Sequence, residues 1–152
     1  MNAPSESQKT IVVGTTEVKP GTRVYVDIRV ADLYTHTELK MPVQVINGKR
    51  PGPTLFVSAA IHGDEINGVE IIRRLLAQKN LRQLRGCLIA VPVVNVHGFL
   101  TQSRYLPDRR DLNRSFPGSS GGSTASRMAR VIWDRFVSKC DMGLDFHTST
   151  RN

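Results

Sequence analysis

A histidine and a glutamate three positions apart are the first residues that could do chemistry. His62 and Glu65 lie in the segment IHGDE, which separates an apolar run from a segment with helical periodicity. An imidazole and a carboxylate at the end of a strand and the start of a helix can converge on one metal ion, and Gly63 permits the tight turn between them. Acidic residues that open a helix also cap it, so this segment alone predicts either a metal site or a helix cap.

Three other histidines could supply a further ligand. His147 ends an alternating segment, whereas His36 lies in a predicted hairpin and His97 follows a predicted strand in a polar loop. In open α/β sheets, ligands bind beyond the carboxyl ends of strands, where we expect both His147 and the IHGDE segment to lie. Two histidines and one carboxylate suit a catalytic zinc ion, which takes three protein ligands. Alternatively, His147 is only a hydrogen-bonded polar residue at a strand end.

A polar loop over residues 95–122 carries several arginines. Arg104, Asn113 and Arg114 can bind anions or carbonyl oxygens, because a guanidinium group pairs with a carboxylate through two hydrogen bonds. A loop of this length inside a compact domain is typically functional or disordered, and the simplest alternative is a solvated loop. An ordered, partly buried loop is favoured by the apolar side chains between the arginines, namely Tyr105, Leu106, Leu112 and Phe116.

Four motifs, taken in their order along the chain, resemble those of a known family. They are HGDE at His62, N-x-x-G-F at residues 95–99, RYLPDRRDLNRSFPG in the polar loop, and DFHT at His147. From about Met41 to His147, the sequence is similar to the succinylglutamate desuccinylase/aspartoacylase family, a branch of the zinc carboxypeptidase superfamily. The resemblance implies a zinc carboxypeptidase-like α/β fold. It also implies zinc-dependent hydrolysis of an amide bond in a small N-acyl amino acid or a similar carboxylate-bearing substrate.

The resemblance assigns roles to individual residues as well. His62, Glu65 and His147 would bind Zn²⁺. Asp111 would orient the first histidine ligand, as carboxylates behind metal-binding histidines do. Arg104 would be catalytic, because it would polarise the scissile carbonyl and stabilise the oxyanion.

The substrate-binding part of the pattern is present, but the general base is not. Asn113 and Arg114 would hold the carboxylate of the substrate. The family's general-base glutamate lies well beyond the third zinc ligand, and no residue up to Asn152 matches it. We therefore expect residues 11–152 to be the N-terminal part of a zinc-hydrolase catalytic domain, truncated before the base, with a flexible leader at residues 1–10.

Two alternative functions fit the same residues. One is a carboxypeptidase-like peptidase that uses the same metal site on a peptide's carboxyl end. The other is a non-catalytic fragment that binds a metal or an anion without turnover, since the general base is missing.

An α/β fold with a mixed sheet is predicted to position these residues. Apolar and alternating runs predict strands over residues 11–13, 22–30, 41–46, 54–61, 87–94 and 140–146. The turn residues Pro20-Gly21 and Asn47-Gly48 predict antiparallel hairpins among the first strands. Helical periodicity over residues 65–79 and after Ser123 predicts two flanking helices, the first inside a parallel strand–helix–strand crossover.

The composition restricts the function further. The chain has 152 residues with 39% hydrophobic and 22% charged ones, as in a globular domain. Its net charge of +8 makes nucleic acid a partner to consider, but the arginines are clustered locally rather than in a stripe, which favours a small anionic substrate over nucleic acid. No apolar run is long enough to span a membrane, and no signal peptide is visible. We expect a cytoplasmic protein with two unpaired cysteines.

Overall fold

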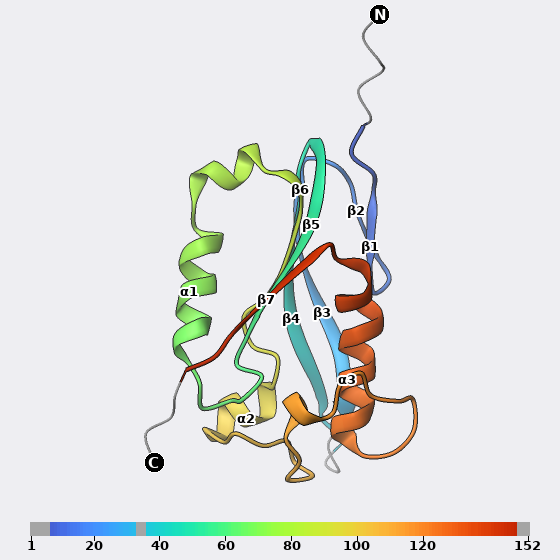
Figure 1. Cartoon of the computed structure of the whole chain (residues 1–152), viewed down its shortest axis with the longest axis vertical. Helices are drawn as coiled ribbons and strands as arrows, with labels where there is room; N and C mark the ends of the chain where they lie inside the picture. The colour runs from blue at the N-terminus through green and yellow to red at the C-terminus, as the bar shows by residue number, and fades with distance from the viewer. Residues whose placement is uncertain (1–6, 33–35, 149–152) are drawn as a thin grey trace, which may run out of the picture.

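A five-stranded mixed sheet forms the centre of the computed structural model, which describes residues 7–32 and 36–148 (Figure 1). The strands follow the order β3-β4-β6-β5-β7 across the sheet. Their bounds are β3 (Thr22–Asp32), β4 (Glu38–Asn47), β5 (Arg50–Ala59), β6 (Arg85–Val91) and β7 (Met142–Phe146). The predicted mixed α/β sheet is confirmed: β4 is antiparallel to β3 and β6, while β5 is parallel to β6 and β7.

The hairpin predictions are correct for β3 and β4 but wrong for the neighbouring strands. A separate two-stranded sheet joins β1 (Ile11–Val13) to β2 (Thr16–Val18), a strand the sequence pattern did not predict. The turn at Asn47-Gly48 leads from β4 into β5, yet these two strands are not paired, because β6 lies between them. A pairing between segments distant in sequence thus overrides the local turn signal.

One helix covers each face of the sheet. Helix α1 (Asn67–Leu76) connects β5 to β6 as the predicted parallel crossover, and helix α3 (Thr124–Arg135) precedes β7 (Figure 1). Alternate strand residues point to opposite faces. Val57 therefore packs in the cluster that contains α1, whereas Phe56 packs in the cluster that contains α3. Ser123 caps α3, because its Oγ accepts a 3.2 Å hydrogen bond from the Ser126 N–H.

The predicted loop over residues 95–122 contains regular structure that its composition did not reveal. It includes the six-residue helix α2 (Val96–Thr101), which begins at a hydrogen bond from the Gly98 N–H to Asn95 Oδ1, and the 3₁₀ helix η2 (Leu112–Arg114). Two further 3₁₀ helices are η1 (Lys79–Gln83) and η3 (Val137–Lys139). Leu112 has no exposed surface, so the loop is ordered and anchored in the core, as its apolar residues predicted.

The two ends of the chain were expected to be a flexible leader and a last strand with one polar side. Part of the predicted leader, residues 1–6, lies outside the described residues, and its last residues are tied down because Asn47 hydrogen-bonds to Gln8 and Lys9. Strand β7 is an edge of the sheet, and the apolar side chains of Met142 and Leu144 are each 53% exposed. None of the described helices is long and apolar enough to cross a bilayer.

Candidate metal centre

The turn after β5 places the first two candidate ligands. The strand ends at Ala59, and a backbone hydrogen bond of 3.1 Å from the Glu65 N–H to the His62 carbonyl oxygen closes the turn. A Cβ atom on Gly63 would lie 1.9 Å from the backbone of Gly98. The glycine is therefore required for the close approach of α2, and this contact is the stronger reason for it than the tight turn expected from the sequence.

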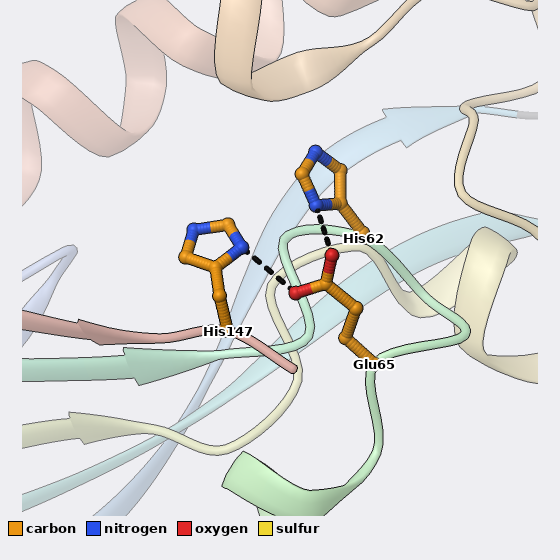
Figure 2. A group of neighbouring side chains, drawn as sticks. All are labelled: His62, Glu65 and His147. Atoms are coloured by element: carbon orange, nitrogen blue, oxygen red, sulfur yellow. Dashed lines mark hydrogen bonds and ion pairs between the residues drawn. The ribbon is translucent and has the colours of Figure 1, made fainter. Parts of the chain in front are cut away.

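The carboxylate of Glu65 lies between the two histidines and contacts both (Figure 2). Its Oε1 is 2.7 Å from His62 Nδ1, and its Oε2 is 2.8 Å from His147 Nδ1. One donor atom from each of the three residues lies within 4.8 Å of the others, a spacing compatible with a common metal ion. The predicted grouping of His62, Glu65 and His147 is thus present in the structure. His36 and His97 are not part of this group.

Access to the centre is one-sided. The side chains of His62 and Glu65 are 3% and 6% exposed, whereas that of His147 is 37% exposed. Strand β7 contributes His147 just beyond its last residue, Phe146, so the two parallel strands β5 and β7 bring the ligand atoms together at the same edge. A small molecule could reach the centre from the side of His147.

Each histidine is also held from behind by an aspartate. His62 Nε2 lies 3.1 Å from Asp111 Oδ1, and His147 Nε2 lies 2.8 Å from Asp145 Oδ2. Histidines that bind metals characteristically use the second ring nitrogen in this way, because a carboxylate partner fixes the ring's orientation. The arrangement leaves both Nδ1 atoms directed at the same point as the Glu65 oxygens, so the donor set fits a metal ion such as zinc.

Asp145 is the functional candidate that the sequence-based prediction missed. Its second oxygen, Oδ1, accepts a 2.8 Å hydrogen bond from Ser58 Oγ on the neighbouring strand β5. The signal was available in the sequence: Asp145 and His147 are two positions apart on a strand, so their side chains point to the same face.

The charge of the centre favours a cation. Burial raises the pKa of the Glu65 carboxyl, but hydrogen bonds from the Thr148 N–H, His62 and His147 outweigh it, so this pKa lies below its ordinary value. The pKa of Asp111 is lowered in the same way, since hydrogen bonds to His62 and Arg104 outweigh its burial. Both carboxylates are therefore ionised at neutral pH, and the centre is acidic within a chain whose net charge is +8.

Arg104 also lies at this centre. Its Nη2 and Nε lie 3.0 and 3.2 Å from Asp111 Oδ2, and its Nη1 lies 3.6 Å from Glu65 Oε1. The side chain of Arg104 is 35% exposed, so it is accessible to solvent in part. Asp111 consequently links Arg104 to His62.

The two predicted substrate-binding residues lie on η2, next to Asp111. The backbone N–H of Asn113 donates a 2.9 Å hydrogen bond to Asp111 Oδ1, while Arg114 is exposed. Among the described residues, neither side chain has an ion pair or hydrogen bond, so both are available to a ligand. Asp108, a possible counter-charge for the arginines, instead accepts a hydrogen bond from the N–H of Ala125 at the start of α3.

Comparison with known proteins identifies the family that the sequence matches. The model of the succinylglutamate desuccinylase/aspartoacylase catalytic domain matches residues 51–152. The N-alpha-acetyl-L-2,4-diaminobutyric acid deacetylase of Halomonas elongata is 32% identical over 112 residues, which are 73% of this chain and 32% of that protein.

Solved structures resemble the chain over most of its length. A succinylglutamate desuccinylase/aspartoacylase from Rhodobacter sphaeroides is 27% identical with a TM-score of 0.75, and the product-bound ectoine utilization protein EutE (DoeB) from Ruegeria pomeroyi is 29% identical with a TM-score of 0.73. Each match covers 83% of this chain and 40% of the other, so the chain spans less than half the length of these relatives. The match to the family's catalytic domain over two thirds of the sequence shows that the chain belongs to the succinylglutamate desuccinylase/aspartoacylase family.

Proposed function

We propose that the chain carries the metal centre and the substrate-binding loop of a zinc-dependent deacylase that cleaves the amide bond of a small N-acyl amino acid. The observation that carries the proposal is the convergence of His62, Glu65 and His147, with an aspartate behind each histidine. Membership of the deacylase family supports the same conclusion, and the relative from Halomonas elongata is named as a deacetylase of an acetylated amino acid.

The metal would be held by His62 Nδ1, His147 Nδ1 and the Glu65 carboxylate. When bound, a zinc ion supplies Lewis acidity to a substrate carbonyl and to a water molecule. Asp111 and Asp145 keep the two imidazole rings oriented, because each is hydrogen-bonded to the Nε2 atom that faces away from Glu65.

Two arginines of the loop would bind different groups of the substrate. Arg104 lies beside Glu65, partly exposed to solvent, and its positive charge can stabilise negative charge that develops on the carbonyl oxygen. Arg114 has no partner for its guanidinium group among the described residues and can pair with the substrate's carboxylate through two hydrogen bonds. Asn113, beside it on η2, can donate a further hydrogen bond to the same carboxylate.

We assign the proton acceptor for the attacking water to no residue of this chain, because none matches the family's general-base glutamate. A positioned general base contributes a factor of about 10² to 10⁴ to the rate. We therefore expect the 152-residue chain to bind zinc but to hydrolyse an N-acyl amino acid slowly.

Zinc titration of the metal-free chain, followed by calorimetry, tests the metal centre. We expect one site per chain and a loss of that site in the His62→Ala, Glu65→Ala double variant. A double variant of two histidines outside the group, His36→Ala with His97→Ala, is the matched control and should bind zinc as the unchanged chain does. Equal zinc affinity in all three proteins would contradict the proposal.

A substrate panel distinguishes the deacylase from the peptidase alternative. In a longer protein that contains this chain, zinc-dependent release of acetate from N-acetyl amino acids supports the deacylase. Release of a carboxyl-terminal amino acid from peptides, with no action on N-acetyl amino acids, would replace it with the carboxypeptidase-like function.

A further inference from the structure

A hollow lies at the end of the sheet opposite the metal centre. It has a volume of about 500 Å³ and is formed by the start of β3, the turn after β4 and the segment that follows α1. Lys49 lines it just before β5, and His62 follows the end of the same strand. A strand of ten residues spans about 30 Å at roughly 3.3 Å per residue, so the hollow is separate from the metal centre.

The carbonyl groups at the end of α1 and the side-chain amide of Asn47 are already hydrogen-bonded within the protein. The last four carbonyl oxygens of α1, residues 73–76, accept hydrogen bonds from the Ala77 N–H, from the Gln78 N–H and side chain, and from Arg23 Nη1. The amide group of Asn47, also in the wall, is bonded to Gln8, Lys9 and Val18. The negative end of the α1 dipole is therefore capped, and no backbone oxygen of its last turn is left for a cation.

The hollow is lined by positively charged side chains that have no acidic partner among the described residues. Three cationic side chains line it without an ion pair or hydrogen bond to any described residue: Lys49, Lys79 and Arg82. No aspartate or glutamate is among the lining residues. The stem of Lys49 packs against Gly21, where an added Cβ atom would lie 2.9 Å from Lys49 Cγ, so this exposed lysine runs along the wall of the hollow.

We infer that the hollow binds a small anion with two or more negative charges, a phosphate-bearing or polycarboxylate molecule. Three exposed cations with no acidic residue among the lining favour a ligand with more than one negative charge, and a volume of about 500 Å³ lies in the range of small-molecule sites. Arg23 contributes a fourth positive charge, fixed by its bonds to the Leu76 carbonyl oxygen and the Gln44 side chain. The site involves none of the metal-binding residues, so it is independent of the proposed deacylase function.

Calorimetric titration of the 152-residue chain with inorganic phosphate, citrate and acetate tests this inference. We expect saturable binding of phosphate, citrate or both at one site, with acetate much weaker, and loss of affinity as salt is raised. Binding of only one of the two multivalent anions would identify phosphate or carboxylate groups as the recognised chemistry. The Lys49→Gln, Lys79→Gln double variant should bind about tenfold more weakly.

A matched variant separates a local site from the effect of overall charge. Lys40 and Lys139 lie outside the hollow. The Lys40→Gln, Lys139→Gln double variant therefore loses the same number of positive charges and should bind phosphate and citrate with unchanged affinity. Equal weakening in the two double variants would overturn the inference. Binding of acetate as tight as that of citrate would also overturn it, and so would a lack of saturation by phosphate and citrate. The second outcome includes the case in which a single-stranded oligonucleotide, titrated in the same way, is the only anion that binds.

Discussion

Each histidine of the centre lies between two carboxylates, and the two arrangements are closely alike. Glu65 contacts the Nδ1 atoms of both rings, while Asp111 and Asp145 contact the Nε2 atoms. The aspartates come from different elements, the polar loop and strand β7. Their shared role follows from geometry: they fix the rings so that both Nδ1 atoms face one point.

Removing the aspartate behind His147 should weaken metal binding without destroying the site. We expect Asp145→Asn to lower zinc affinity by about 10- to 100-fold, the usual effect of losing a carboxylate behind a metal-binding histidine. Ser58→Ala should lower it less, because Ser58 acts only through Asp145. Competition with a zinc chelator measures both effects.

The control for this experiment is an aspartate that is distant from the centre. Asp134 is on the surface of α3 and pairs with Arg130, so Asp134→Asn removes the same charge and should leave zinc affinity unchanged. An unchanged affinity in Asp145→Asn as well would show that the contact with His147 does not position the ring.

Replacing Arg104 and replacing Arg114 should change different kinetic constants. Because Arg114 would bind a substrate carboxylate that does not change in the reaction, Arg114→Ala should mainly raise KM. Because Arg104 lies at the centre itself, Arg104→Ala should mainly lower kcat, by a factor of about 10² to 10³ if it stabilises the oxyanion.

Steady-state kinetics on a longer protein that contains this chain can measure that difference. The substrates are an N-acyl amino acid and its carboxyl-amidated analogue. Arg114→Lys should raise KM less than Arg114→Ala does but not leave it unchanged, since an ammonium group cannot pair with a carboxylate through two hydrogen bonds as a guanidinium group does. If the unchanged enzyme uses the amide as well as the acid, Arg114 is not the carboxylate anchor.

At the scale of elements, the polar loop depends on one buried leucine. Leu112 begins η2 and has no exposed surface, and the same short helix carries Asn113 and Arg114. Leu112→Ala should therefore destabilise the fold by about 2–5 kcal/mol. Urea unfolding measures the loss. Leu100 is in α2 and 73% exposed, so Leu100→Ala should have little effect, and a similar cost in both variants would contradict the anchoring role.

Most elements could be predicted from local sequence because their burial patterns are local. Alternation identified β3, and a spacing of three and four identified α1 and α3. The order of strands could not be obtained in this way: β6 separates β4 from β5, and that pairing depends on the whole sheet. Helix α2 was missed because six residues are too few to show a helical period.

Within the candidate site, the metal-ligand group is the part that the structure can be compared with. Residue type and expected position at strand ends made His62, Glu65 and His147 candidates, and the family resemblance implied that they are the zinc ligands. The structure brings the three together. The link from His147 to Asp145 and on to Ser58 could not be completed from sequence alone, because it requires the pairing of β7 with β5.

At the scale of the whole molecule, the two proposed sites differ in the charges that surround them. The metal centre gathers Glu65, Asp111 and Asp145 at the carboxyl ends of β5 and β7, whereas unpaired cations line the hollow at the other end of the sheet. A net charge of +8 therefore describes neither end, and it supports a basic nucleic-acid-binding role less than the local arrangement supports two small sites of opposite sign.

Acid should destabilise the metal-free chain, and the sign follows from the carboxylates. The pKa values of Glu65 and Asp111 lie below their ordinary values in the folded state, because hydrogen bonds outweigh the burial that raises them. The unfolded chain therefore binds more protons as the pH falls below about 4 to 5. The stability that these groups contribute is present above that range and is lost as the pH falls through the folded-state values.

Urea unfolding of the metal-free chain at pH 7 and pH 3 tests this prediction. We expect a lower midpoint at pH 3, and a smaller difference between the two pH values in Glu65→Gln, which cannot titrate. Glu17 is exposed on β2, so Glu17→Gln is the matched control and should keep the full difference. Glu70 will contribute in the same direction, since Arg73 and Arg74 lower its pKa to about 2. If Glu65→Gln and Glu17→Gln give the same pH dependence, the ionised Glu65 carboxylate does not stabilise the metal-free centre through its histidine contacts.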